Sequence, residues 1–226
     1  MRPINAASPR VVEEEVLDSL SFDDPLTARI HRDIDRYNRI LGHYSWIVKM
    51  LNEFARPSDR LLEIAAGSGR LLKRLHSNGA LDPFSSVKAF DAVCEKPKDL
   101  PESIDWHVCR AEEFTDYHKA DIIIVCNFYH QLNDHALRRL GAEMSKARLL
   151  LAAETHRSSI AYRLCQASRL IGFSSIGIGD GLKSLHAGFR ERELPTLLNL
   201  APNKWTVKTN ASHLGWYRMN AHQRTS

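Results

Sequence analysis

The sequence predicts an α/β fold built on an open, mostly parallel sheet, and three observations support this. Short apolar runs suited to buried strands alternate with segments whose apolar residues recur at helical spacing. The run at 121–126, DIIIVC, is dominated by β-branched residues and suits a central strand buried on both faces. The chain closes with two short alternating segments, at 205–209 and 215–219, which we expect to pair antiparallel.

Composition and charge exclude several classes of protein. With 226 residues, 43% of them hydrophobic and 26% charged, the chain has the make-up of an ordinary globular domain. No apolar run approaches the length of a membrane span, and the first residues lack a hydrophobic signal core. The four cysteines form no C-x-x-C pair, which favours a reducing compartment, so we expect a cytoplasmic protein. The net charge of +4 is small, which disfavours nucleic acid as a partner.

The segment at 60–72, RLLEIAAGSGRLL, predicts a buried strand, a tight turn and a helix. Gly67 and Gly69 have no Cβ, so a ligand can approach the backbone of the turn closely. A dinucleotide site would need a third glycine at Leu72, and a phosphate loop would need one there too. Glu63 lies near the carboxyl end of the strand, where its carboxylate suits a cationic amino group. The segment therefore predicts a ligand with an amino-acid end, or else a glycine turn that only packs helix on sheet.

The sequence EIAAGSG resembles the first motif of the class I S-adenosylmethionine-dependent methyltransferases, with Ala65 where that motif usually has its first glycine. The next predicted strand, at 86–90, ends in Asp91, which is placed to accept hydrogen bonds from the two hydroxyls of a ribose. The resemblance implies a Rossmann-like, doubly wound sheet of seven strands with a reversed C-terminal strand. It also implies S-adenosyl-L-methionine as the cofactor and S-adenosyl-L-homocysteine as the product.

The resemblance extends to the residues that would bind this cofactor. Many family members have an acid directly before the alanine, and that acid reaches the exocyclic amine of the adenine, but here Arg110 holds the acid's position. Either Glu112 or the backbone of Ala111 is expected to replace it. Residues that follow the strand at 121–126 should border the reactive end of the cofactor, because open α/β sheets bind ligands beyond the carboxyl ends of their strands. The expected cofactor residues are Glu63, Ala65, Gly67, Ser68, Gly69, Asp91, Ala92, Ala111, Glu112, Asn127 and Phe128.

Two parts of the chain are expected to form the acceptor pocket. Residues 1–54 are predicted to be an N-terminal helical lid, with a loosely attached start at 1–10 and helices at 11–20 and 25–54. Residues 55–226 are predicted to form the methyltransferase domain, with an inserted helix at about 159–173 followed by a glycine-rich loop to residue 181. The side chains predicted for the substrate pocket are Tyr37, Asn38, Tyr129, Tyr162 and Phe189, although core packing is the commoner fate of aromatic residues.

Methyl transfer from a sulfonium depends mainly on placing the acceptor in line with the methyl carbon and excluding water. A hydroxyl acceptor also needs a base, and His130 is the first candidate because it follows a strand end and titrates near neutral pH. His156, at the end of the fifth predicted strand, is the second candidate. The alternative is a histidine that only shapes the pocket. The sequence offers no cluster of acids for a divalent cation, so we predict no metal site.

The leading hypothesis is a methyltransferase that acts on a hydroxyl, or an activated carbon, of a small phenolic, quinone or polyketide-like acceptor. The segment at 154–189 also resembles small stand-alone bacterial methyltransferases found with polyketide and quinone pathways. The alternatives are a methyltransferase for RNA or protein, and a subunit that binds S-adenosylmethionine without catalysis. The sequence is compatible with a homodimer.

Overall fold

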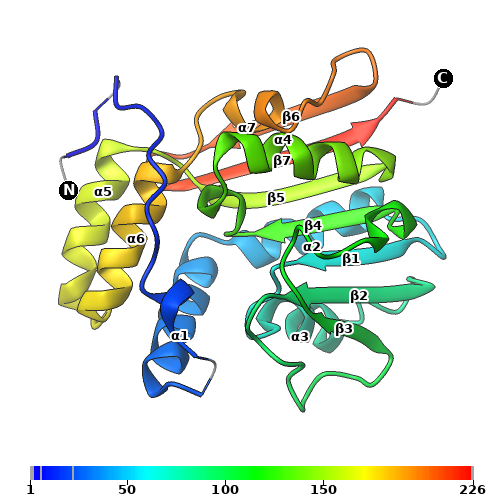
Figure 1. The fold of residues 1–226 in the computed structure, drawn as a ribbon, viewed down its shortest axis with the longest axis horizontal. Helices are drawn as coiled ribbons and strands as arrows, with labels where there is room; N and C mark the ends of the chain where they lie inside the picture. The colour runs from blue at the N-terminus through cyan, green and yellow to red at the C-terminus, as the bar shows by residue number, and fades with distance from the viewer. Residues whose placement is uncertain (1–2, 6, 22, 225–226) are drawn as a thin grey trace.

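The computed structural model describes residues 3–5, 7–21 and 23–224, and these form one seven-stranded sheet flanked by helices (Figure 1). The strand order is β3-β2-β1-β4-β5-β7-β6. Strands β1 to β5 are parallel, and β7 runs antiparallel between β5 and β6. The strands are β1 Arg60–Ile64, β2 Ser86–Asp91, β3 Ile104–Val108, β4 Ile122–Cys126, β5 Leu149–Thr155, β6 Trp205–Ala211 and β7 Trp216–Gln223. The predicted fold class, with its reversed C-terminal strand, is confirmed.

The strand order reverses at β1, which lies between β2 and β4. Leu61 of β1 pairs with Val87 of β2 on one side and with Ile122 of β4 on the other. The chain leaves the sheet in opposite directions from this point, so the carboxyl ends of β1 and β4 border a crevice where open α/β sheets bind ligands. The side chains of β4 from Ile122 to Val125 are completely buried, as the sequence predicts for a central strand.

The pleat of the strands divides the core between the two faces of the sheet. Leu61 and Ile122 point to one face, where they pack with Leu72 of α3. Their neighbours Leu62 and Ile123 point to the other face. The first face is covered by α2 His43–Phe54 and α3 Arg70–Ser77, and the second by α4 Asp134–Glu143 and α7 Glu193–Leu197. Single 3₁₀ turns are found at η1 Leu17–Ser19, η2 Asp116–Lys119, η3 Tyr129–Gln131, η4 Met144–Lys146 and η5 Ser168–Ile171.

Three further helices, α1 Pro25–Ile40, α5 Ser159–Ala167 and α6 Ser175–Ala187, gather beyond the carboxyl ends of the parallel strands (Figure 1, left). Helix α1 begins as the sequence predicts, with Pro25 in the first turn and Asp24 accepting a 2.8 Å hydrogen bond from the backbone of Leu26. The predicted helix over 25–54 is two helices, because Gly42 adopts a left-handed conformation and redirects the chain.

The segment before α1, residues 3–5 and 7–20, is here called the strap. The predicted helix over 11–20 is wrong, because only the 3₁₀ turn η1 forms there. Its backbone instead bonds to distant partners: Val11 donates to the carbonyl of His186, and Val16 and Leu17 donate to the carboxylate of Asp180. The described part of 1–10 is not loosely attached either, because the carbonyls of Asn5 and Ser8 accept hydrogen bonds from the guanidinium groups of Arg190 and Arg157. Residues 1, 2 and 6 lie outside the described residues.

The predicted glycine-rich loop before residue 181 is also wrong, because this segment forms the first turns of α6. Ser174 caps the helix by accepting a 3.0 Å hydrogen bond from the backbone of Gly177. A Cβ at Gly177 would lie only 2.7 Å from a carboxylate oxygen of Asp33 in α1. That oxygen also accepts from the backbone and hydroxyl of Ser174. The glycine therefore allows α1 and α6 to approach closely.

Within the described residues, no helix has both the length and the apolar character needed to cross a membrane.

Candidate functional site

A cavity of about 670 Å³ lies between the ends of the parallel strands and the cover formed by α1, α5, α6 and the strap. This volume is within the roughly 300–1,000 Å³ of small-molecule sites. Most residues that the sequence assigns to the cofactor line it, together with part of the predicted acceptor pocket. The predicted residues in the lining are Tyr37, Asn38, Glu63, Ala65, Gly67, Ser68, Asp91, Ala92, Ala111, Asn127, Phe128 and His130.

The glycine turn after β1 is open toward this cavity. Gly67 has a φ of 54°, and a Cβ there would meet nothing within 4 Å, so the backbone is accessible to a ligand. Gly69 has a different reason to be glycine, because a Cβ there would lie 2.9 Å from Leu100. Gly69 thus begins α3 and packs against a neighbouring loop instead of lining the cavity.

Asp91 joins this turn to the loop after β2. One of its carboxylate oxygens accepts a 2.8 Å hydrogen bond from the backbone of Gly67. The other accepts from the backbones of Val93, at 3.0 Å, and Cys94, at 2.8 Å. Three backbone donors therefore hold the carboxylate in one orientation at the cavity wall. The interval from Glu63 to Asp91 is the predicted strand-helix-strand unit, and this hydrogen bond joins its turn to the end of its second strand.

Two non-glycine residues at strand ends have left-handed backbones. Ala65 follows β1 with a φ of 52°, and Asn127 follows β4 with a φ of 57°. Such a conformation costs an alanine about 1–2 kcal/mol. Strained residues of this kind concentrate at ligand sites, and both of these line the cavity. The position where the motif departs from glycine keeps the glycine-like backbone.

Glu63 is the clearest sign that the site is completed by a ligand. Its side chain is buried, and its Oε2 has no hydrogen-bond partner among the described residues. Burial, and to a smaller extent the nearby Asp91, raises the pKa of Glu63 to about 8. A buried carboxyl group without a partner is costly, and a ligand ammonium group would supply the missing charge and donors.

The two expectations for the adenine contact are separated by the structure. Ala111 lines the cavity beside Cys109. Glu112 is exposed and lies outside the lining, with a carboxylate oxygen 3.9 Å from the guanidinium of Arg110. Its carboxylate is therefore paired at the surface, and Ala111 is the one of these two residues that borders the cavity.

The lid helix α1 is tied directly to the end of β4. Asn38 is buried and accepts a 2.6 Å hydrogen bond from the side chain of Asn127. Asn38 also donates to the hydroxyl of Tyr44 in α2, at 3.2 Å. Because Asn127 has the strained backbone described above, the lid contacts the site at one of its constrained residues. Tyr37 lines the same part of the cavity.

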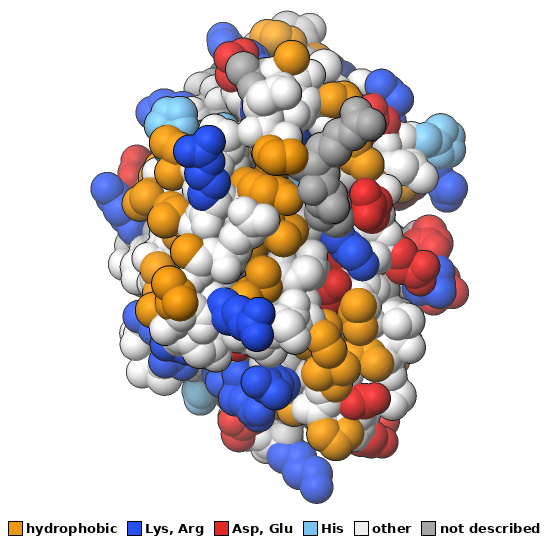
Figure 2. All heavy atoms as spheres, turned by 90° about the vertical axis from the view of Figure 1, so that its left-hand side faces the viewer, with side chains coloured by type: hydrophobic (Ala, Val, Ile, Leu, Met, Phe, Trp, Pro, Cys, Tyr) orange, Lys and Arg blue, Asp and Glu red, His pale blue; other side chains and the backbone are white. Residues whose placement is uncertain are grey.

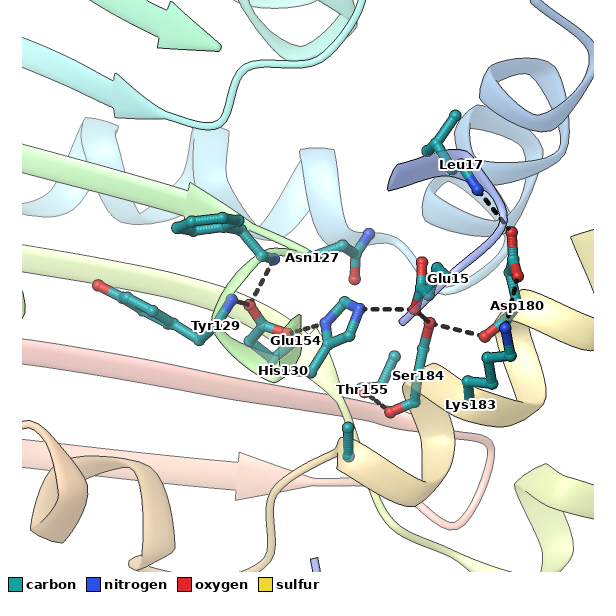
Figure 3. A network of polar contacts seen from close by, with 12 residues as sticks. Glu15, Leu17, Asn127, Tyr129, His130, Glu154, Thr155, Asp180, Lys183 and Ser184 are labelled. Carbon is teal, nitrogen blue, oxygen red and sulfur yellow. Dashed lines mark hydrogen bonds and ion pairs between the residues drawn. The ribbon is translucent and has the colours of Figure 1, made fainter. Parts of the chain in front are cut away.

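His130 lies between two buried carboxylates (Figure 3). Its Nδ1 is 2.8 Å from Glu154, which also accepts hydrogen bonds from the backbones of Phe128 and Tyr129. Its Nε2 is 3.4 Å from Glu15 of the strap. Burial lowers the pKa of His130, but the two carboxylates outweigh burial and raise it to about 10. In this arrangement the ring is a cation at neutral pH and has protons to donate.

Glu15 is a site residue that sequence analysis missed. It lines the cavity and is 6% exposed, whereas its neighbours Glu13 and Glu14 are exposed. Burial raises its pKa, but the hydrogen bond and charge of His130, with the hydroxyl of Ser184, outweigh burial and lower it. Nothing in an acidic run distinguishes the one side chain that turns inward, so no local signal could have found it.

Besides Gly69 and Glu112, four predicted site residues lie outside the cavity, for identifiable reasons. Tyr129, Tyr162 and Phe189 are buried in the hydrophobic core instead. The hydroxyl of Tyr129 contacts the sulfur of Met144 at 3.3 Å, and the ring of Tyr162 packs edge-on against His186. His156 pairs through its Nδ1 with the carbonyl of Ser212, at 2.9 Å, and borders a separate small hollow.

Among the described residues, no three His, Cys, Asp or Glu side chains are grouped to hold a metal ion.

We compared the chain with known proteins to identify others that share this architecture. No protein-family model matches the chain, and no curated protein matches it. Solved structures do match. The plantazolicin methyltransferase BpumL, in complex with a triazolic desmethylPZN analog and SAH, superimposes with a TM-score of 0.65 at 13% identity, over 90% of this chain and 93% of that one. The plantazolicin methyltransferase BamL, with the same kind of ligands, gives 0.65 at 11% identity, over 89% and 92%.

A putative O-methyltransferase from Nostoc punctiforme PCC 73102 gives a TM-score of 0.57 at 12% identity, over 81% of this chain and 56% of that one. The methyltransferase domain of bacterial CtHen1 gives 0.54 at 14% identity, over 83% and 99%. These similarities, with the strand order and the glycine turn, show that the chain has the fold of the class I S-adenosylmethionine-dependent methyltransferases.

Proposed function

We propose that the protein is an S-adenosylmethionine-dependent methyltransferase that methylates a hydroxyl group of a small, largely apolar acceptor. The observation that carries this proposal is Glu63, a buried carboxyl group without a partner among the described residues, next to the open backbone of Gly67. A ligand whose amino-acid end carries an ammonium group satisfies this arrangement. The similar plantazolicin methyltransferases, which are solved with SAH, support the same ligand.

The residues of the site divide the work of binding the cofactor. Glu63 would pair with the ammonium group, and the carboxylate of Asp91 would accept hydrogen bonds from the ribose hydroxyls. The backbone at Gly67 leaves room for the ligand, and the backbone of Ala111 would border the adenine. When bound, S-adenosylmethionine supplies an activated methyl group on a sulfonium. The chain contributes position and exclusion of water, because the cavity is covered by α1, α5, α6 and the strap.

The outer part of the cavity indicates an apolar acceptor. Its lining includes Leu164, Leu170 and Ile171, which are also exposed at the surface, Leu170 to 88%. Figure 2 shows hydrophobic side chains gathered on this face, which is the side of the molecule that carries α1, α5 and α6. An acceptor entering here would meet apolar walls first and the polar groups at the strand ends last. A phenolic, quinone or polyketide-like compound with a hydroxyl group fits this order.

Calorimetric titration with S-adenosylmethionine and S-adenosylhomocysteine tests the proposal. We expect the protein to bind both with dissociation constants on the order of micromolar. Asp91→Ala should weaken binding about 10- to 100-fold, because it removes a charged hydrogen-bond acceptor worth about 1.5–3 kcal/mol. Glu112→Ala is the matched control: it removes an exposed acid near the same end of the sheet, and should leave the affinity unchanged. No binding by the wild-type protein would refute the proposal.

A further inference from the structure

The strap places Glu15 in the cavity through anchors on both sides. Before it, the guanidinium of Arg10 donates to the carbonyls of Tyr129, His130 and Leu132, at 3.2, 3.0 and 2.6 Å. After it, the carboxylate of Asp180 accepts from the backbones of Val16, at 2.9 Å, and Leu17, at 3.2 Å. The position of Glu15 is therefore set by α6 and by the loop after β4, not by the conformation of the strap alone.

The charges around Glu15 are unequal. Glu15 and Glu154 share the single imidazolium of His130, so these three side chains together carry an excess of one negative charge. Ser184 also donates its hydroxyl to Glu15 (Figure 3). The neighbouring cation, Lys183, lies 3.7 Å from Asp180 and so shares its charge with another acid. These contacts keep Glu15 ionised, and a buried carboxylate is stabilised by each further hydrogen-bond donor that reaches it.

Both nitrogens of His130 are occupied by carboxylates, which prevents it from accepting a proton in this arrangement. Glu154 is fully buried and accepts two backbone hydrogen bonds as well, so it holds the ring in place. Of the three side chains, Glu15 is the carboxylate that borders the cavity together with His130; Glu154 is not part of the lining.

We propose that Glu15 accepts the hydrogen of the acceptor's hydroxyl group, and that His130 and Glu154 are positioning residues that hold its carboxylate in place. The inference rests on the proposed function and names the group that the acceptor contacts. It also changes the role that the sequence suggested for His130, from base to positioning residue.

The step balances without a further reactant. The acceptor oxygen forms a bond to the methyl carbon, while the bond from that carbon to sulfur breaks and its electron pair stays on sulfur. The hydroxyl proton passes to the carboxylate of Glu15. The excess negative charge of the three side chains is thereby neutralised, and the positive charge of the sulfonium disappears in the same step. Solvent takes the proton from Glu15 after the product leaves.

The test measures hydrogen donation directly, with simple probes. The protein, loaded with S-adenosylhomocysteine, is titrated with 4-ethylphenol and with ethylbenzene, which lacks only the hydroxyl group. We expect the wild-type protein to bind the phenol about 10- to 100-fold more tightly, because a hydrogen bond to a charged group is worth about 1.5–3 kcal/mol. Glu15→Gln should remove most of this preference and leave the affinities for ethylbenzene and S-adenosylhomocysteine unchanged.

Two further variants separate the role of Glu15 from general effects. Glu14→Gln removes the same charge from the adjacent, exposed position and should keep the full preference. His130→Asn should reduce the preference for the phenol without changing the affinity for ethylbenzene, whereas loss of structure would weaken both probes together.

The outcomes distinguish this inference from the proposed function. If the wild-type protein binds S-adenosylhomocysteine but does not prefer 4-ethylphenol to ethylbenzene, the inference is overturned and the proposed function stands. Retention of the full preference in Glu15→Gln also overturns it. If the wild-type protein does not bind S-adenosylhomocysteine, the proposed function fails, and the inference fails with it. The first comparison needs no variant, so a folding defect in Glu15→Gln leaves the test intact.

Discussion

The two ends of the cavity are built in different ways. At the cofactor end, the groups that matter lie on β1, the turn after it and the end of β2, within one strand-helix-strand unit. At the acceptor end, the strap, α1, α5 and α6 come from widely separated parts of the chain. The cofactor end depends on backbone geometry, which a short motif specifies. The acceptor end depends on side chains that are positioned by long-range contacts.

The largest effect should come from Glu63 at the cofactor end. Glu63→Gln keeps the size of the side chain but removes the charge that would pair with the ligand's ammonium group. We expect the affinity for S-adenosylmethionine to fall about 10- to 100-fold. The melting temperature of the ligand-free protein should rise, because a buried acid without a partner is removed. Calorimetry and thermal unfolding measure the two effects, and an unchanged affinity would show that the amino-acid end binds elsewhere.

At the acceptor end, replacing Arg10 tests how much its contacts stabilise the docked strap. Its side chain is 9% exposed and donates to several backbone carbonyls, so Arg10→Ala should lower the free energy of unfolding by about 2 kcal/mol. Hydrogen exchange at the amides of Val16 and Leu17 should become faster, while the affinity for S-adenosylmethionine stays the same. Arg29→Ala, at an exposed position of α1, serves as the control. If Arg10→Ala also weakened the binding of S-adenosylmethionine, the cofactor end and the acceptor end of the cavity would not be independent.

The pH dependence of cofactor affinity should also be set at the cofactor end, by Glu63. The pKa of Glu63 in the ligand-free protein is raised to about 8, so the group is protonated at lower pH and must lose its proton to pair with an ammonium group. Affinity for S-adenosylmethionine should therefore rise by about tenfold for each pH unit up to about pH 8. Titrations between pH 6 and pH 8 measure the slope. Glu63→Gln should flatten it, and a slope that persists in this variant would assign the titration to another group.

The smallest effect is expected at Ala65. Glycine adopts the left-handed backbone of this position without the alanine's cost of about 1–2 kcal/mol, but it loses about 0.5–1 kcal/mol through the greater freedom of the unfolded chain. Ala65→Gly should therefore raise the free energy of unfolding by up to about 1 kcal/mol and leave cofactor affinity unchanged. Chemical denaturation measures it. Ala66→Gly, at the next residue, should instead destabilise the protein.

This contrast also explains how much the sequence could predict. The strands were predicted from apolar runs such as 121–126, and the glycine turn and Asp91 from their spacing, because these signals are local. Within the strap, the sequence predicts a helix over 11–20, and no local signal reveals that the backbone of Val16 instead bonds to Asp180, 164 residues away. The start of α6 was predicted to be a loop, because the reason for Gly177 is its contact with Asp33 of another helix.

The aromatic residues show the same limit at the level of one side chain. Phe128 and Tyr129 are adjacent, and both were assigned to the site. Phe128 lines the cavity, whereas the 3₁₀ turn that begins at Tyr129 directs its ring into the core, against Met144. A sequence shows that aromatic residues follow a strand, but the direction of each ring depends on a single turn of backbone.

The contacts of Arg10 also have a consequence for the order in which the molecule is assembled during synthesis. Arg10 leaves the ribosome before the sheet does, yet it donates to the carbonyl of Ala187, 177 residues later. The sheet from β1 to β5 can form before that carbonyl exists, but the strap has no place to dock until α6 has been made. A nascent chain that has already formed its glycine turn would thus hold an open site, and the strap, although it is translated before the sheet, would be among the last segments to fold.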